Sequence, residues 1–208
     1  MHTKSSTDIV ALDAQAVLAS VDLVARVTAA DLARPTPCAD WTLHGLLRHM
    51  IAQHHGFAAA SAGDGDLANW MLRPLGDDPV AAYQAAAERV LDAFAADGPL
   101  EREFPLPELK LGLLFPARQA ISFHFVDYVV HSWDVAATLG LPLELDQPVL
   151  DAALRVARAV PGGDFRLEPG AAFGPAVGGY DEPAASGLDR IIALLGRSPA
   201  WRPTFVPA

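Results

Sequence analysis

The chain has 208 residues, a formal net charge of −10 and 51% apolar residues. Its basic residues form no cluster, so we expect no nucleic-acid partner. Its apolar stretches stay well short of the roughly 20 residues that span a bilayer, so we expect no membrane segment. The single cysteine, Cys38, excludes an internal disulfide and a zinc site built from thiolates alone. Any metal site must therefore use histidine and carboxylate ligands.

The length fits one domain over residues 1–208, present as a monomer or a homodimer. The first eight residues, Met-His-Thr-Lys-Ser-Ser-Thr-Asp, lack the apolar stretch of a secretory signal. We therefore expect a cytoplasmic location, and the acidic balance favours a small-molecule ligand over a polyanion.

The first two long helices follow from periodicity and caps. Four valines spaced by seven, four and three residues predict a helix from about Thr7 to Asp31. The prolines at 35 and 37 interrupt it, and Asp40 or Thr42 can cap a second helix that runs to about Ala62.

The third and fourth helices flank an irregular segment. Asp78 and Pro79 form an N-cap and first-turn pair for a third helix, whose apolar stripe ends before Gly98. Residues 98–115 predict an irregular insert, with a short strand or hairpin. Pro116 opens the longest helix, which stops at Gly140.

Two smaller helices are expected near the C-terminus. One runs from residues 146–148 to about Val160, and after a loop over 161–187 Ser186 caps a short helix closed by Gly196. The fold class is therefore all-α, an up-and-down four-helix bundle with an irregular insert before the fourth long helix and small C-terminal helices. Residues from about 161 to 208 are expected to pack on the bundle.

The longest helix carries a polar stripe on an otherwise apolar surface. His124, Asp127, His131 and Asp134 follow one another at steps of three, four and three, so they project from one side. An enclosed carboxylate needs a partner or a metal, and an acid with a histidine one turn later can bind one cation. Asp127 and His131 are candidate metal ligands on this ground, although the same spacing is typical of a solvated or salt-bridged face.

A third ligand is expected from the second helix, where periodicity does not choose among His49, His54 and His55. The apolar stripe centres nearer His54, whereas His49 lies at its edge beside small residues such as Gly45 and Gly56. Small residues let a neighbouring helix or a bound molecule approach closely, which favours the edge with His49 as the cavity side. The choice stays open on the residues alone.

Five blocks of sequence resemble the metal-binding domain of mycothiol-dependent maleylpyruvate isomerases and their DinB-like relatives. They are TPCADWT at 36–42, LLRH at 46–49, DYVVHSWDVA at 127–136, AFGP at 172–175 and LGRSPAW at 195–201. They occur in the family's order and span nearly the whole chain.

The resemblance implies that His49, Asp127 and His131 bind one divalent metal, usually zinc. The acid in these relatives is more often glutamate, and Asp127 is one methylene shorter. The resemblance also implies that mycothiol, a low-molecular-weight thiol of some bacteria, binds the metal at an open position. Its thiolate then attacks a small electrophile.

Further residues receive supporting roles. Asp134 is expected to orient a ligand histidine. Arg48 and Arg197 could hold a substrate carboxylate by forked hydrogen bonds, and Trp133 could line the pocket. His124 is the reserve ligand or base, and Cys38 is interpreted as a small packed residue.

Three functions remain in competition. The leading one is a metal-dependent mycothiol transferase or isomerase-like enzyme. Maleylpyruvate isomerisation itself is not expected, because the chain ends soon after Trp201 and the true isomerases carry a further C-terminal domain. The alternative is a non-catalytic metal-binding or sensor protein, with a fourth ligand from His124 or Asp134. A non-haem iron enzyme, built on two histidines and one carboxylate, ranks third.

Overall fold

The computed structural model describes residues 8–38, 41–109, 111–168, 171–180 and 185–203. Its helices are α1 (Ile9–Val24), α2 (Leu43–Ser61), α3 (Pro79–Ala95), α4 (Ala117–Leu139), α5 (Gln147–Ala159) and α6 (Gly187–Leu194). The predicted all-α fold class is confirmed.

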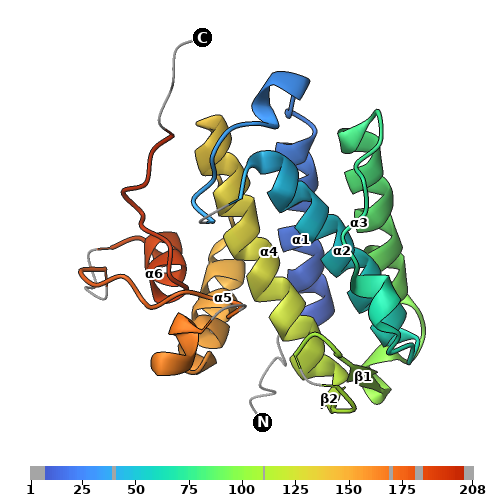
Figure 1. Ribbon diagram of the computed structural model, residues 1–208. Coiled ribbons are helices and arrows are strands. Elements are labelled where there is room, and N and C mark those ends of the chain that lie inside the picture. The colour runs from blue at the N-terminus through green and yellow to red at the C-terminus, as the bar shows by residue number, and fades with distance from the viewer. Residues whose placement is uncertain (1–7, 39–40, 110, 169–170, 181–184, 204–208) are drawn as a thin grey trace.

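The four long helices pack as a bundle in which α1 and α2 each lie against both α3 and α4 (Figure 1). Helix α5 packs against α4 and α1, and α6 lies against α5 and α4. Helix α4 is therefore the bundle helix that contacts both C-terminal helices. None of the described helices is long and apolar enough to cross a membrane.

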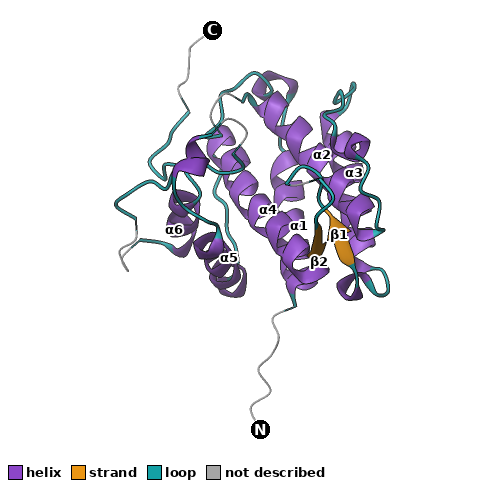
Figure 2. Ribbon diagram, turned by 60° about the horizontal axis from the view of Figure 1, so that its bottom comes forward, coloured by secondary structure: helices purple, strands orange, loops and turns teal. Residues whose placement is uncertain are grey.

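The predicted hairpin before α4 is confirmed. Strands β1 (Glu103–Pro105) and β2 (Leu114–Pro116) pair antiparallel, with Phe104 opposite Phe115. Figure 2 shows this hairpin at one end of the bundle. Helix α4 begins directly after β2, so the hairpin determines where the polar stripe starts.

The helix starts follow local hydrogen bonds made by short polar side chains. The Thr42 hydroxyl accepts from the Gly45 N–H, the Asp78 carboxylate from the Ala81 N–H, and the Ser186 hydroxyl from the Asp189 N–H. All three predicted caps are confirmed. The alternative cap, Asp40, lies outside the described residues.

The first helix is shorter than predicted. It ends at Val24, and a separate 3₁₀ turn covers Ala29–Asp31. The Asp31 carboxylate accepts from both the backbone N–H and the hydroxyl of Thr28, at 2.9 and 2.7 Å. This capping box gives Thr28 an extended backbone that cannot continue α1. At the other end, Thr7 lies outside the described residues, and Asp8 caps the helix.

One small residue of α2, Gly56, is covered by the protein itself. A Cβ at Gly56 would lie 2.2 Å from a ring atom of Trp70, which is buried in the 3₁₀ turn Leu67–Trp70. At Gly56, therefore, the close approach predicted for a neighbour is made by Trp70 and leaves no room for a bound molecule.

We predict that Gly56→Ala destabilises the fold by about 1–3 kcal/mol, because the indole must move out of a packed core. Urea unfolding followed by circular dichroism measures the change. Gly45→Ala is the matched control, since a Cβ there would meet Trp41 at an ordinary 3.7 Å and helix propensity favours alanine. Equal stability of the two variants would contradict the packing argument.

Candidate metal centre

Two neighbouring helices bring His49, Asp127 and His131 together. The Nε2 atom of His131 lies 3.3 Å from Asp127 Oδ1, and the Nε2 atom of His49 lies 3.9 Å from Asp127 Oδ2. One donor atom from each residue lies within 4.8 Å of the other two. The structure thus brings together the three residues that the resemblance implied.

The donor set fits a divalent cation. Donors bound to one tetrahedral zinc at about 2.1 Å lie roughly 3.4 Å from one another, close to the separations seen here. In the part of the chain that the structure describes, no fourth histidine, cysteine or acidic side chain joins this group. Two imidazoles and one carboxylate can hold zinc or another first-row divalent metal.

The centre is open on one side. The side chains of His49 and Asp127 are 23% and 20% exposed, whereas that of His131 is 4% exposed. The Trp41 ring lies 4.7 Å from the His49 ring and 6.5 Å from the His131 ring. Trp41, the residue before the Thr42 cap of α2, is half-buried and lies beside both histidine rings.

The three side chains strongly shift one another's pKa. Burial lowers the pKa of His49 to about 4, and the charge of His131 acts in the same direction. Burial also opposes protonation of His131, but the Asp127 and Asp134 carboxylates outweigh it and raise its pKa to about 9. Burial would raise the pKa of Asp127, yet the two histidines hold it well below its ordinary value. At neutral pH His49 therefore offers a free lone pair, whereas His131 must lose a proton before it can bind a cation.

Asp134 lies behind His131, away from Asp127. Its Oδ2 atom accepts from His131 Nδ1 at 2.9 Å, and the Asp134 side chain is fully buried. Because Nδ1 is engaged by Asp134, the other ring nitrogen of His131, Nε2, faces Asp127. The geometry has the form expected of a residue that orients a ligand histidine.

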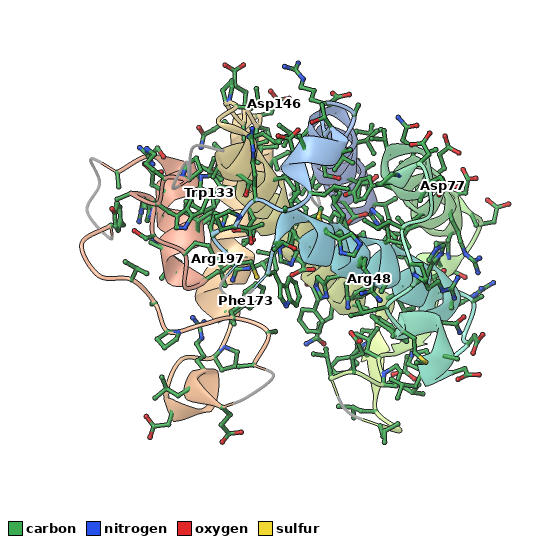
Figure 3. The ribbon with its side chains drawn as sticks, turned by 45° about the horizontal axis from the view of Figure 1, so that its top comes forward. Arg48, Asp77, Trp133, Asp146, Phe173 and Arg197 are labelled. Atoms are coloured by element: carbon green, nitrogen blue, oxygen red, sulfur yellow. The ribbon has the colours of Figure 1, made fainter. Side chains whose placement is uncertain are left out.

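Arg197 contacts the same carboxylate from the C-terminal segment, the part of the chain that follows α5 (Gln147–Ala159). Its Nη2 donates to Asp134 Oδ2 at 3.1 Å, and its Nε to Asp134 Oδ1 at 3.4 Å. From the sequence, this guanidinium was a candidate to bind a substrate carboxylate. In the structure it binds the Asp134 carboxylate of the protein itself. Figure 3 shows Arg197 between the C-terminal segment and the bundle.

The other two residues proposed to contact a ligand lie elsewhere. Arg48 donates from Nε to the Arg73 carbonyl at 2.8 Å and lines a shallow surface hollow with Pro74 and Asp77. Trp133 is half-buried on α4, toward the C-terminal segment (Figure 3). Among the described residues, no hydrogen bond, ion pair or ring contact joins the Arg48 or Trp133 side chain to the three candidate ligands.

His124 belongs to a separate, fully buried network. Its Nδ1 lies within hydrogen-bond distance of Asp13 Oδ1, at 2.7 Å, and its Nε2 lies 3.2 Å from His54 Nδ1. Burial raises the pKa of Asp13 and lowers that of His54 well below its ordinary value. These contacts tie α1, α2 and α4 together, and no cation group of the described residues includes His124.

A further acidic side chain, Glu108, contacts α2 one helical turn beyond His49. Gln53 follows His49 by one turn of α2, and its amide donates to Glu108 Oε2 at 2.7 Å. Burial raises the pKa of Glu108, and the charge of Asp127 contributes in the same direction. Glu108 has no sequence signal of its own, because it lies in the irregular insert and only the fold brings it to α2.

The sequence matches a known protein family. Residues 14–136 match the family described as the mycothiol maleylpyruvate isomerase N-terminal domain. Two uncharacterized proteins of Mycobacterium tuberculosis, from strains CDC 1551 and H37Rv, are each 34% identical over 184 residues, covering 85% of this chain and 90% of the relative. No solved structure matches the chain. The chain belongs to the mycothiol maleylpyruvate isomerase N-terminal domain family.

Proposed function

We propose that this protein binds one divalent cation, zinc by preference, through His49, Asp127 and His131, and transfers a low-molecular-weight thiol to a small electrophile. The observation that carries the proposal is a three-residue donor group that is open on one side. The family name points to mycothiol as the thiol.

A cation held by three protein ligands is a Lewis acid that lowers the pKa of a thiol bound at a remaining position. The protein supplies the setting for this chemistry. Burial keeps His49 neutral and therefore ready to donate its lone pair. Trp41 lies beside both histidine rings and gives the site an aromatic wall. Transfer then forms one carbon–sulfur bond, and the electrophile gives up a leaving group or opens a ring.

The proton released by the thiol needs an acceptor, and we assign this role to Glu108, an acidic side chain outside the donor group. Its Oε2 accepts from Gln53, which follows His49 by one turn of α2. A raised pKa suits a carboxylate that takes up a proton and returns it to the leaving group or the opened oxygen. The proton balance then closes within the site.

The open side favours catalysis over simple metal storage. A storage or sensor site was expected to gain a fourth ligand from His124 or Asp134. In the structure His124 bonds to Asp13 in the core, and Asp134 lies on the far nitrogen of His131. Neither residue belongs to the group formed by the three candidate ligands.

We predict that His49→Ala lowers the affinity for Zn²⁺ by roughly 100-fold or more, because only two donors remain. Isothermal titration of the metal-free chain measures this affinity. His55→Ala, on the same helix and outside the donor group, is the control and should retain normal affinity. With the metal-loaded protein, mycothiol should perturb the absorption of a cobalt-substituted centre and support turnover of small electrophiles. Absence of both effects would exclude the thiol-transfer proposal while leaving metal binding intact.

A second prediction concerns pH. Cation binding should strengthen by about tenfold for each pH unit between roughly pH 6 and 9 and level off above that range, because only His131 has to lose a proton. His49, with a pKa of about 4, adds no proton in this range. Titrations in buffers of different ionisation enthalpy should therefore detect about one released proton at pH 7. Release of two protons, or of none, would contradict the assigned charges.

A third prediction tests the proton acceptor. Glu108→Gln should lower kcat by about 100-fold and leave Zn²⁺ affinity nearly unchanged, since the amide keeps the shape but cannot accept the proton. Steady-state kinetics with mycothiol and an electrophile give kcat. Glu103→Gln, an exposed position on β1 of the same hairpin, is the matched control. Equal rates for both variants would remove Glu108 from the mechanism.

A further inference from the structure

The imidazole of His131 lies between two groups of metal-ligand side chains. Its Nε2 faces Asp127 and His49, and its Nδ1 faces Asp134. On the Nδ1 side, donor atoms of Cys38, His131 and Asp134 also lie within 4.8 Å of one another. By donor type alone, this second group could hold a soft divalent cation.

The second group already contains a positive charge supplied by the chain. Arg197 Nη2 lies 3.2 Å from Cys38 Sγ and 3.1 Å from Asp134 Oδ2. The guanidinium stays charged at every pH at which the protein is folded, and it pairs with the fully buried carboxylate through two nitrogens. A metal ion in the same place would meet this charge at close range.

The backbone of the C-terminal segment determines where Arg197 lies. The preceding residue, Gly196, has a φ of +85°, and a Cβ there would lie 2.8 Å from the backbone of Gly174. The Arg197 N–H donates to the Ile192 carbonyl at 2.9 Å, and its Nη1 to the Leu195 carbonyl at 3.2 Å. The side chain is only 6% exposed. Hydrogen bonds thus hold both the backbone and the guanidinium of Arg197. The residue before it has a positive φ, a conformation that favours glycine.

We propose that Arg197 is a positioning residue for the metal centre. It serves as an internal cation that neutralises Asp134, keeps metal out of the group formed with Cys38, and leaves His131 to bind through Nε2. This inference rests on the metal site of the proposed function, but not on thiol transfer. It extends the centre beyond the matched family region, residues 14–136, into the C-terminal segment.

Removal of the guanidinium should therefore create a competing site. In Arg197→Ala, the second group keeps three donors and loses its cation. Metal-free full chain is titrated with Co²⁺, because a thiolate bound to Co²⁺ gives a near-ultraviolet charge-transfer band that histidine and carboxylate ligands lack. We expect no such band for the wild type and a clear band for Arg197→Ala. The band should disappear again in Arg197→Ala combined with Cys38→Ser.

Affinity and ligand atom give independent readouts. Co²⁺ binding at the first group should weaken by about 10–100-fold in Arg197→Ala, the range typical when the partner of a ligand histidine is disturbed. Nitrogen-15 NMR of the Zn²⁺-loaded protein should report His131 bound through Nε2 in the wild type and partly through Nδ1 in the variant. Arg197→Lys keeps a positive charge without the forked contact, so it should weaken affinity without the thiolate band. Arg202→Ala, an exposed arginine of the same segment, is the control.

A further variant covers the case in which Arg197→Ala fails to fold. Asp134→Leu combined with Arg197→Met removes both charges together and avoids an unpaired buried carboxylate. It should fold and bind Co²⁺ about 10–100-fold more weakly, because His131 loses the acceptor on Nδ1.

The outcomes separate this inference from the proposed function. Wild-type affinity in the double variant, or unchanged spectra and affinity in a folded Arg197→Ala, would overturn the positioning role. A thiolate band in the wild type would overturn it as well. If the wild type bound no cation through His49, Asp127 and His131, the proposed function would fail first, and this inference with it.

Discussion

Helix α4 carries four polar side chains along one side of a mostly buried surface, and each of them needs a partner. An enclosed imidazole or carboxylate without a hydrogen bond or an opposite charge is costly, so these partners constrain the surrounding structure. His124 finds Asp13 on α1, Asp127 lies against His49 on α2, and Asp134 binds Arg197 in the C-terminal segment. One polar stripe thus fixes contacts to three other parts of the chain.

The two halves of this stripe have opposite characters. The half around His124 is sealed, and neither Asp13 Oδ2 nor His54 Nε2 has a hydrogen-bond partner among the described residues. The half around Asp127 is only partly covered, and its side chain is 20% exposed. A ligand from solvent can reach the second half alone. Incomplete burial, more than residue type, therefore separates the candidate centre from the structural network.

Much of the fold could be predicted from local signals. Apolar periodicity and short polar caps predicted the six α-helices of the described residues, because both act within a few residues. The first helix was predicted too long because the Thr28 and Asp31 pair was overlooked, although it is visible in the sequence as a capping pattern. Asp13 was missed for a different reason. Periodicity treats a polar residue as facing solvent, whereas this one shares the buried side of α1.

The candidate site was only partly accessible to the same reasoning. Spacing along one helix pointed to Asp127 and His131, but three histidines of the next helix were equivalent until the family resemblance selected His49. Contacts between distant segments had no sequence signal at all. Arg197 meets Asp134 across 63 positions, and Glu108 meets Gln53 across 55. Such pairs depend on how the helices pack, which periodicity does not contain.

The contact between Asp134 and Arg197 also links the metal centre to the packing of the C-terminal segment. The similarity to the mycobacterial relatives covers 85% of this chain, more than residues 1–136 can supply, so it includes part of that segment. If Arg197 favours the orientation of His131 that binds a cation, linkage requires that a bound cation favours the packed position of Arg197 by the same free energy. The centre and the C-terminal segment would then stabilise each other. A bundle ending at α4 would lose both the arginine and this mutual stabilisation.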